Sequence, residues 1–237
     1  MLNNEQYTDG GASDNLSIVG GKWTMRVEEG TVGAEPRKLT KGKHEGATVW
    51  EVSYLNVIGY LASGRLVENE HIGMQAEILL KDGAESYLIS LPASVKDMSI
   101  YLKTIIEALP NIDAHETVVF CLEDTGKKTR TGTPKYRLKV RQNNKVVPSY
   151  YVDIKDNGAG GYNIIPKNGM PEASLLRDGS KDYSEQNDFL LMKFEEYFAD
   201  FSGRQSGDSG DMYKENPPDE PVEEEPADMD GMDSIPF

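Results

Sequence analysis

The most regular pattern in the chain runs over residues 71–91, His-Ile-Gly-Met-Gln-Ala-Glu-Ile-Leu-Leu-Lys-Asp-Gly-Ala-Glu-Ser-Tyr-Leu-Ile-Ser-Leu. Apolar side chains recur at every second position on both sides of the Asp82-Gly83 pair. This alternation predicts two half-buried strands, and the Asp-Gly pair predicts the hairpin turn between them. The apolar positions are Ile72, Met74, Ala76, Ile78 and Leu80, followed by Tyr87, Ile89 and Leu91.

The period of the pattern changes directly after this hairpin. Ser94 and Asp97 resemble a capping box, and Pro110 is a helix terminator, so we expect a helix over residues 94–109. The apolar residues between these two signals follow helical spacing: Met98, Tyr101, Leu102, Ile105, Ile106 and Leu109.

Further strands are predicted on both sides of the hairpin and helix. The same period of two predicts strands over residues 21–29, 48–60, 116–123 and 134–154. A second helix is expected over 184–201, and residues 155–182 are expected to be irregular. Counting residues 71–91 as one unit, the order is three strands, a helix and two strands. That order predicts a mainly β protein with two helices, built as an OB-fold-like five-stranded barrel with a C-terminal helix.

Composition limits the class of protein. The 237 residues include 40 acidic and 25 basic side chains and one cysteine, for a net charge of −15. One cysteine forms no intrachain disulfide, and no apolar run is long enough to span a bilayer. The first residues lack the basic and apolar regions of a secretory signal. We therefore expect a soluble, cytoplasmic protein and exclude disulfide scaffolds, membrane proteins and zinc fingers.

The charge is distributed unevenly along the chain. Residues 125–152 carry eight cations and no acid, which predicts contact with an anionic partner. On the predicted barrel, this run and a second basic cluster fall on the two loops that bind oligonucleotides in OB-folds, residues 124–134 and 30–47. The cations that we expect to contact phosphates are Arg37, Lys38, Lys41, Lys43, Lys127, Lys128, Arg130, Lys135, Arg137, Lys139 and Arg141.

Single-strand binding also needs aromatic side chains on which bases stack. The candidates are Trp50, Tyr54, Tyr150 and Tyr151. Trp50, like Trp23, is in phase with apolar neighbours, so core packing explains it equally well. Tyr150 and Tyr151 are adjacent, so in a strand at most one of them is buried. Tyr60 follows Gly59 near the end of a predicted strand and is a further candidate for an exposed ring.

Catalytic and metal-binding motifs are not evident. The chain has no phosphate-binding loop of the G-x-x-x-x-G-K-[ST] type. His44, His71 and His115 lie far apart, and none pairs with Cys121 at ligand spacing. We therefore expect no enzyme activity, no cofactor and no metal.

The last 35 residues differ from the rest of the chain. Residues 203–237 are acidic and proline-rich without apolar periodicity, which predicts a disordered tail, and residues 1–17 are expected to be disordered as well. The folded domain is thus expected to span residues 18–202. The tail ends in an apolar tip with a free carboxylate, which is typical of a linear recognition element. The expected partner-binding residues are Asp230, Asp233, Ile235, Pro236 and Phe237.

This tip, Met-Asp-Ser-Ile-Pro-Phe, resembles the acidic tip of bacterial single-stranded DNA-binding proteins, with Ser234 where that family usually has Asp. The resemblance covers about ten residues. It implies an OB-fold that coats single-stranded DNA without sequence preference and recruits replication, recombination and repair proteins through its tip. The body does not match the bacterial family, which is the divergence expected of a bacteriophage-encoded member. The family's tetramer is not carried over, and homo-oligomerisation stays open.

Two other functions fit the same features. A recombination mediator or strand-annealing protein would also bind single strands, as part of a ring or filament. A DNA-mimicking interaction module would instead use the acidic tail to bind basic partners.

Overall fold

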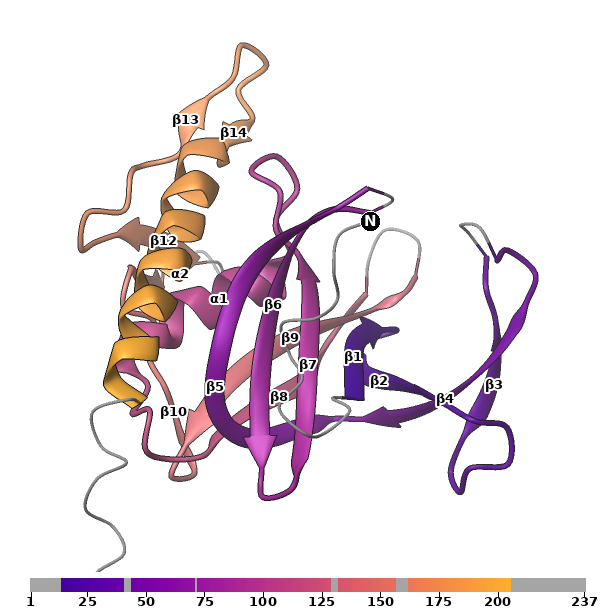
Figure 1. The fold of residues 1–237 in the computed structure, drawn as a ribbon. Coiled ribbons are helices and arrows are strands. Elements are labelled where there is room, and N and C mark those ends of the chain that lie inside the picture. Colours follow the sequence, from indigo (N-terminus) through magenta and orange to yellow (C-terminus); the bar gives the residue numbers. More distant parts are fainter. Residues whose placement is uncertain (1–13, 41–43, 71, 129–131, 157–161, 206–237) are drawn as a thin grey trace, which may run out of the picture.

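The computed structural model describes residues 14–40, 44–70, 72–128, 132–156 and 162–205. In these ranges the chain is mainly β with two α-helices, which confirms the predicted class (Figure 1). The helices are α1 Ile100–Ala108 and α2 Ser184–Gln205, and a 3₁₀ turn, η1 Leu109–Asn111, follows α1. The strands are β1 Asp14–Val19, β2 Lys22–Val27, β3 Glu35–Lys38, β4 Thr48–Tyr54, β5 Asn56–Asn69, β6 Gly73–Asp82, β7 Glu85–Pro92, β8 Val118–Lys128, β9 Pro134–Gln142, β10 Lys145–Val146, β11 Val152–Asp156, β12 Tyr162–Pro166, β13 Ser174–Leu175 and β14 Lys181–Asp182.

Ten strands form one curved sheet in the order β10-β9-β8-β5-β6-β7-β1-β2-β4-β3. Its middle, β8-β5-β6-β7, is a Greek key in which α1 lies in the long connection from β7 to β8. The closed five-stranded barrel predicted from the sequence is not confirmed. Among the described residues the end strands β10 and β3 do not pair with each other, so the sheet stays open.

Strand β5 connects the two halves of the sheet (Figure 1). Its first residues pair with β8 and the rest with β6, and the register shifts between Leu61 and Ser63. Gly64 lies under the ring of Phe198 of α2. A Cβ at Gly64 would stand 2.3 Å from that ring, so only glycine permits this close approach. Helix α2 can therefore pack closely against the buried side of β5.

The predicted turn at Asp82-Gly83 is confirmed by its backbone conformation, and a second tight turn lies between β9 and β10. Gly83 adopts φ +59° between β6 and β7, and Asn143 and Asn144 adopt φ 52° and 60° between β9 and β10. Consecutive left-handed residues match the right-handed twist of the flanking strands. The registers of both hairpins follow from these turns.

Helix α1 begins later than the sequence predicts. Ala93 forms a bridge with Met98, which holds the preceding backbone in a non-helical path. The Ser94 hydroxyl accepts a hydrogen bond from the Asp97 amide, so the predicted capping box closes a turn in front of the helix instead. The end of the helix is confirmed within one turn, since Pro110 lies in η1.

Helix α2 confirms the predicted second helix and extends it to Gln205, beyond the expected domain boundary at 202. It packs against β5 and α1, and its apolar face is buried. Figure 1 shows both helices on the side of the sheet away from β3. The buried side chains of α2 include Leu190, Phe194, Phe198 and Phe201.

Strand β1 corrects the expectation that residues 1–17 are disordered, because residues 14–17 belong to it. It pairs in parallel with β7 and antiparallel with β2. Trp23 of β2 is fully buried, and its indole N–H donates a 2.9 Å hydrogen bond to the Phe120 carbonyl. Trp23 is therefore a core residue.

Two regions were predicted with the wrong local structure. The expected strand over 146–154 is instead β10 and the start of β11, which are separate elements. Residues 155–182, expected to be irregular, contain β12 and the short β13–β14 pair. No helix in the described ranges is both long enough and apolar enough to cross a bilayer.

Candidate nucleic-acid interface

One face of β5, β8 and β9 carries four of the cations of residues 125–152, and we call it the basic face: Lys135, Arg137, Lys139 and Arg141. In the pairing register, Ile58 lies beside Val119 and Val119 beside Arg141. In the next row, Asn56 lies beside Cys121 and Cys121 beside Lys139. Residues paired across strands point to the same side of a sheet. The opposite face of the same strands belongs to the core, with Val57, Phe120, Leu122, Leu138 and Val140 buried.

The centre of the basic face holds a carboxylate. Glu123 of β8 is paired with Arg137 at 3.2 Å, with Lys139 at 2.7 Å and with Arg141 at 2.9 Å. These contacts, with the hydrogen bond from Lys139 as the largest, lower the pKa of Glu123. Residues 125–152 contain no acid, but in the folded protein Glu123, which precedes them, lies among their cations. In the fold, one anion shares three cations and leaves a net charge of +2.

Three lysines lie near the end of the basic face, toward the loop that connects β8 and β9, and Lys128, which pairs with Pro134, points to the opposite side of the sheet from Lys135. Lys127 and Lys128 end β8, Lys135 lies at the start of β9, and all three are exposed. None of them takes part in an ion pair within the described residues. Arg130, predicted to bind beside them, lies outside the described residues. These lysines are the cations most accessible to a phosphate backbone.

Two large apolar side chains are exposed on the same side of β5, one of them in the row of Arg141. Ile58 is 47% and Tyr60 46% exposed, and both lie on β5 at alternate positions. Tyr60 pairs with the exposed Lys81 of β6. A flat ring next to lysines is the arrangement on which a base can stack while its phosphates are neutralised. Tyr60 is thus an exposed ring, as its place near the end of a predicted strand led us to expect.

Arg37 and Lys38 of the other basic cluster lie elsewhere, on β3, which together with β2 and β4 we call the wing. Figure 1 shows the wing standing away from the helices, and β3 and β9 are near opposite ends of the strand order. The single groove predicted for the two basic clusters stays a prediction. Lys41 and Lys43 lie outside the described residues.

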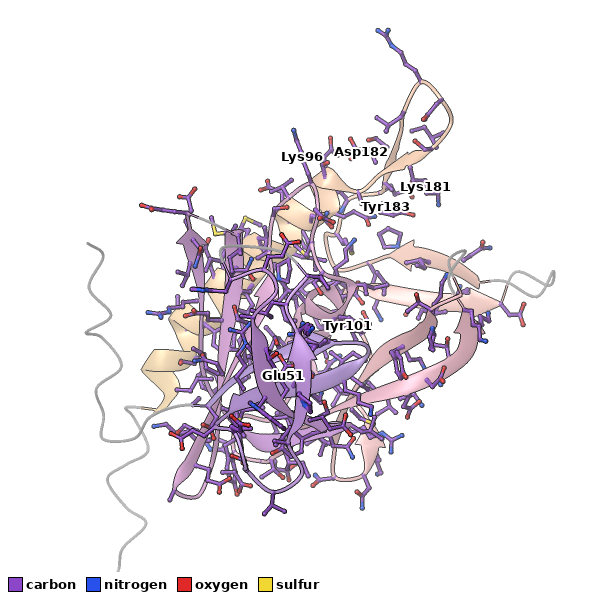
Figure 2. All side chains as sticks on the ribbon, turned by 90° about the vertical axis from the view of Figure 1, so that its right-hand side faces the viewer. Glu51, Lys96, Tyr101, Lys181, Asp182 and Tyr183 are labelled. Carbon is purple, nitrogen blue, oxygen red and sulfur yellow. The ribbon has the colours of Figure 1, made fainter. Side chains whose placement is uncertain are left out.

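Arg37 of the wing is held by a carboxylate that the sequence did not single out. Its guanidinium donates two 2.6 Å hydrogen bonds to Glu51, which is only 7% exposed. Arg26 approaches the same carboxylate at 3.9 Å. Figure 2 shows Glu51 on the side of the molecule that the wing occupies. Arg37 thus stabilises the wing, because breaking this pair would leave a buried carboxylate without a partner.

The other wing residues face away from Arg37. Lys38 is exposed and next to Arg37 in β3, so their side chains point to opposite faces. Trp50 is half-buried and pairs with Val27 and Pro36. Tyr54, 41% exposed, lines a cleft of about 330 Å³ that Ile58 of β5 also lines, together with the acids Asp14, Asp82 and Glu85. That acidic cleft does not favour phosphate beside Tyr54.

Tyr150 and Tyr151 belong to a different part of the fold. Tyr151 is buried against Phe189 of α2, whereas Tyr150 is 38% exposed, as expected for adjacent residues. Their rings meet edge to face, and they lie beside the helices rather than on the basic face. The predicted tip residues, Asp230, Asp233, Ile235, Pro236 and Phe237, lie outside the described residues.

Among the described residues no three His, Cys, Asp or Glu side chains gather in the manner of metal ligands. Comparisons with protein-family models, curated proteins and solved structures find no match to this chain.

Proposed function

We propose that this protein binds single-stranded DNA without sequence preference, and that it does so on the basic face without catalysing a reaction. The observation that carries the proposal is the register that places Arg141 in one row with Ile58 and Lys139 in the next row, with Tyr60 two residues further along β5. The exposed lysines Lys127, Lys128 and Lys135 lie further along β8 and β9, toward the loop that connects them. Phosphate contacts would supply affinity, and the apolar side chains would take the bases.

The strand order supports an OB-fold as the finer description. Strands β5, β6 and β7, helix α1 and strands β8 and β9 follow the order strand-strand-strand-helix-strand-strand. The unit is therefore later in the chain than the one we expected from the sequence, where residues 21–29 and 48–60 were counted as its first two strands. The β1–β2 hairpin and the wing are then additions to the OB-fold unit.

The C-terminal tip supplies the second half of the proposal. An acidic tether ending in Ile235-Pro236-Phe237 would recruit replication, recombination or repair proteins to the coated strand. The tether would raise the local concentration of such partners near the bound DNA. It would do so without occupying the basic face, which holds the DNA.

The test is fluorescence anisotropy of labelled oligo-dT and of a duplex of equal length, titrated with the full chain at several salt concentrations. We expect binding to the single strand that weakens steeply with salt, and weaker binding to the duplex. Absence of salt-dependent binding to oligo-dT would overturn the proposal. Rapid pairing of complementary strands by a ring or filament would instead assign the protein to the annealing class.

Glu123 is expected to limit the affinity of the basic face. Glu123→Gln frees one cationic charge, so the plot of log K against log salt should become steeper by about one unit, and binding at 0.1 M salt should tighten about eightfold. Glu195→Gln, an equal change of charge at an exposed position of α2, is the control and should leave both quantities unchanged. Weaker binding by Glu123→Gln would show that the carboxylate positions the cations rather than competing with phosphate.

A further inference from the structure

The hairpin formed by β11 and β12 is separate from the curved sheet, and we call it the ribbon (Figure 1). Among the described residues its two strands pair only with each other, so one edge of β11 is unpaired. Ile154 of β11 and Ile164 of β12 lie opposite each other and are 66% and 63% exposed. A two-stranded ribbon alone is marginally stable in water, and adjacent exposed apolar side chains are typical of a contact surface. The ribbon is therefore a candidate interface.

The hydrogen bonds of the ribbon show which backbone groups point to the unpaired edge. The Lys167 amide donates a 2.8 Å hydrogen bond to the Tyr151 carbonyl, directly before the paired residues of the two strands. In an antiparallel pair, residues bonded to the partner strand alternate with residues whose N–H and C=O groups face away from it. Asp153 and Lys155 are therefore bonded to β12, and Ile154 between them directs its N–H and C=O groups to the unpaired edge. The centre of this edge thus offers one donor and one acceptor.

The side chains on either side of Ile154 carry opposite charges. Asp153 and Lys155 are exposed and point to the face opposite Ile154. If two copies of β11 pair antiparallel about a two-fold axis at Ile154, Asp153 of each copy lies opposite Lys155 of the other. Asp153 already accepts a hydrogen bond from Lys167 at 2.8 Å, whereas Lys155 takes part in no ion pair among the described residues. The edge of β11 is therefore complementary in charge to a second copy of itself.

Neighbouring strand edges are less suited to such pairing. Strand β12, on the other side of the ribbon, ends in Pro166, and the end strand β3 of the curved sheet contains Pro36. A proline has no N–H to donate, which is how many edge strands are kept from pairing with other chains. Strand β10, at the opposite end of the curved sheet, has only two residues. Strand β11 has five residues and no proline.

We propose that two copies of this chain form a dimer in which β11 pairs antiparallel with β11 of the second copy and joins the two ribbons into one sheet. The two Ile154 residues exchange N–H to C=O hydrogen bonds at the two-fold axis. Their side chains and Ile164 of each copy form one apolar strip, and two pairs of Asp153 with Lys155 form on the other face. One short strand per copy takes part, which is typical of a weak interface. Dimer formation needs no DNA and is independent of the function proposed above.

The test is sedimentation equilibrium of the full chain without DNA, at concentrations up to about 1 mM. We expect a reversible equilibrium between monomer and dimer. Ile154→Pro removes the outward N–H and no hydrogen bond to β12, so it should abolish the dimer. Hydrogen exchange of the native chain locates the contact: protection of the Ile154 amide should rise with protein concentration, and the Ile164 amide, on the other edge of the ribbon, should not change. A chain that stays monomeric, or a dimer that Ile154→Pro leaves intact, would overturn the proposal.

Two charge reversals make the test specific for the register. Asp153→Lys and Lys155→Asp each place like charges opposite each other at two positions, so either change alone should raise the dissociation constant of the dimer by about fivefold or more. In an equimolar mixture of the two variants, each lysine of one chain lies opposite an aspartate of the other, so a heterodimer should form about as well as the native dimer. Lys181→Asp, an equal reversal at an exposed position of β14, is the control and should dimerise like the native chain. If the mixture associates no better than either variant alone, pairing about Ile154 is wrong.

Discussion

Replacing Lys127, Lys128 and Lys135 together by glutamine is expected to weaken oligo-dT binding by about two to three orders of magnitude at 0.1 M salt. Each exposed lysine that neutralises a phosphate contributes nearly one unit to the slope of log K against log salt, so the slope should fall by about three. These lysines have no ionic partner in the described structure, so the whole loss is a loss of binding to the ligand. Anisotropy titrations across a salt series measure both quantities.

The control for this prediction is a triple variant with the same change of net charge. Lys96, Lys155 and Lys181 are exposed and lie on other elements; Figure 2 shows Lys96 and Lys181 together at one end of the molecule, near Asp182 and Tyr183. Their replacement by glutamine should change the slope by much less. If both triple variants weaken binding equally, the effect comes from net charge, and the basic face is not the binding surface.

The second large effect is expected at Tyr60. Tyr60→Ala should cost about 1 to 3 kcal/mol of binding free energy, the amount that stacking of one base on an aromatic ring contributes, which corresponds to about a 5- to 150-fold loss of affinity. The salt slope should stay as it is in the native protein, because no phosphate contact is lost. This combination separates stacking from charge neutralisation.

Two variants complete the Tyr60 experiment. Tyr60→Phe keeps the ring and should bind almost as well as the native protein. Tyr183→Ala removes a ring of similar exposure, 43% against 46%, at the other end of the molecule and should leave binding unchanged. Equal losses in Tyr60→Ala and Tyr183→Ala would argue against a stacking site on β5.

The local elements of the fold were predictable from periodicity, whereas their partners were not. The alternation around Asp82-Gly83 locates β6 and β7, and the strict alternation of 134–142 matches β9. Periodicity placed α1 correctly between β7 and β8, but it does not say which strands pair, so the pairing of β5 with β8 could not be predicted from it. The segment that contains β1 looks polar and turn-like, and it becomes a strand only because β7 offers it an edge.

In the candidate site, too, local patterns were predictable from the sequence and contacts between strands were not. The cations of β9 were predicted from their charge and alternation, since outward-facing lysines and arginines recur at every second residue. Glu123 lies two residues before the acid-free run and was missed because its relation to Arg137 is across strands. Pairing residues 116–123 with 134–142 around their connecting loop would have placed the two side by side. Glu51 was missed for the same reason, because it reaches Arg37 from a neighbouring strand.

The parallel pairing of β1 with β7 has a consequence for the order of folding. Leu16 lies beside Ile89, 73 residues later in the chain, and the Trp23 indole reaches a carbonyl 97 residues away. Closing such long loops is slow compared with forming the hairpins of neighbouring strands. The N-terminal strands therefore leave the ribosome first and find their places last, after β7 and β8 have been synthesised. Until then the Trp23 side chain is exposed on the nascent chain. There it is available for contact with chaperones or with other apolar segments.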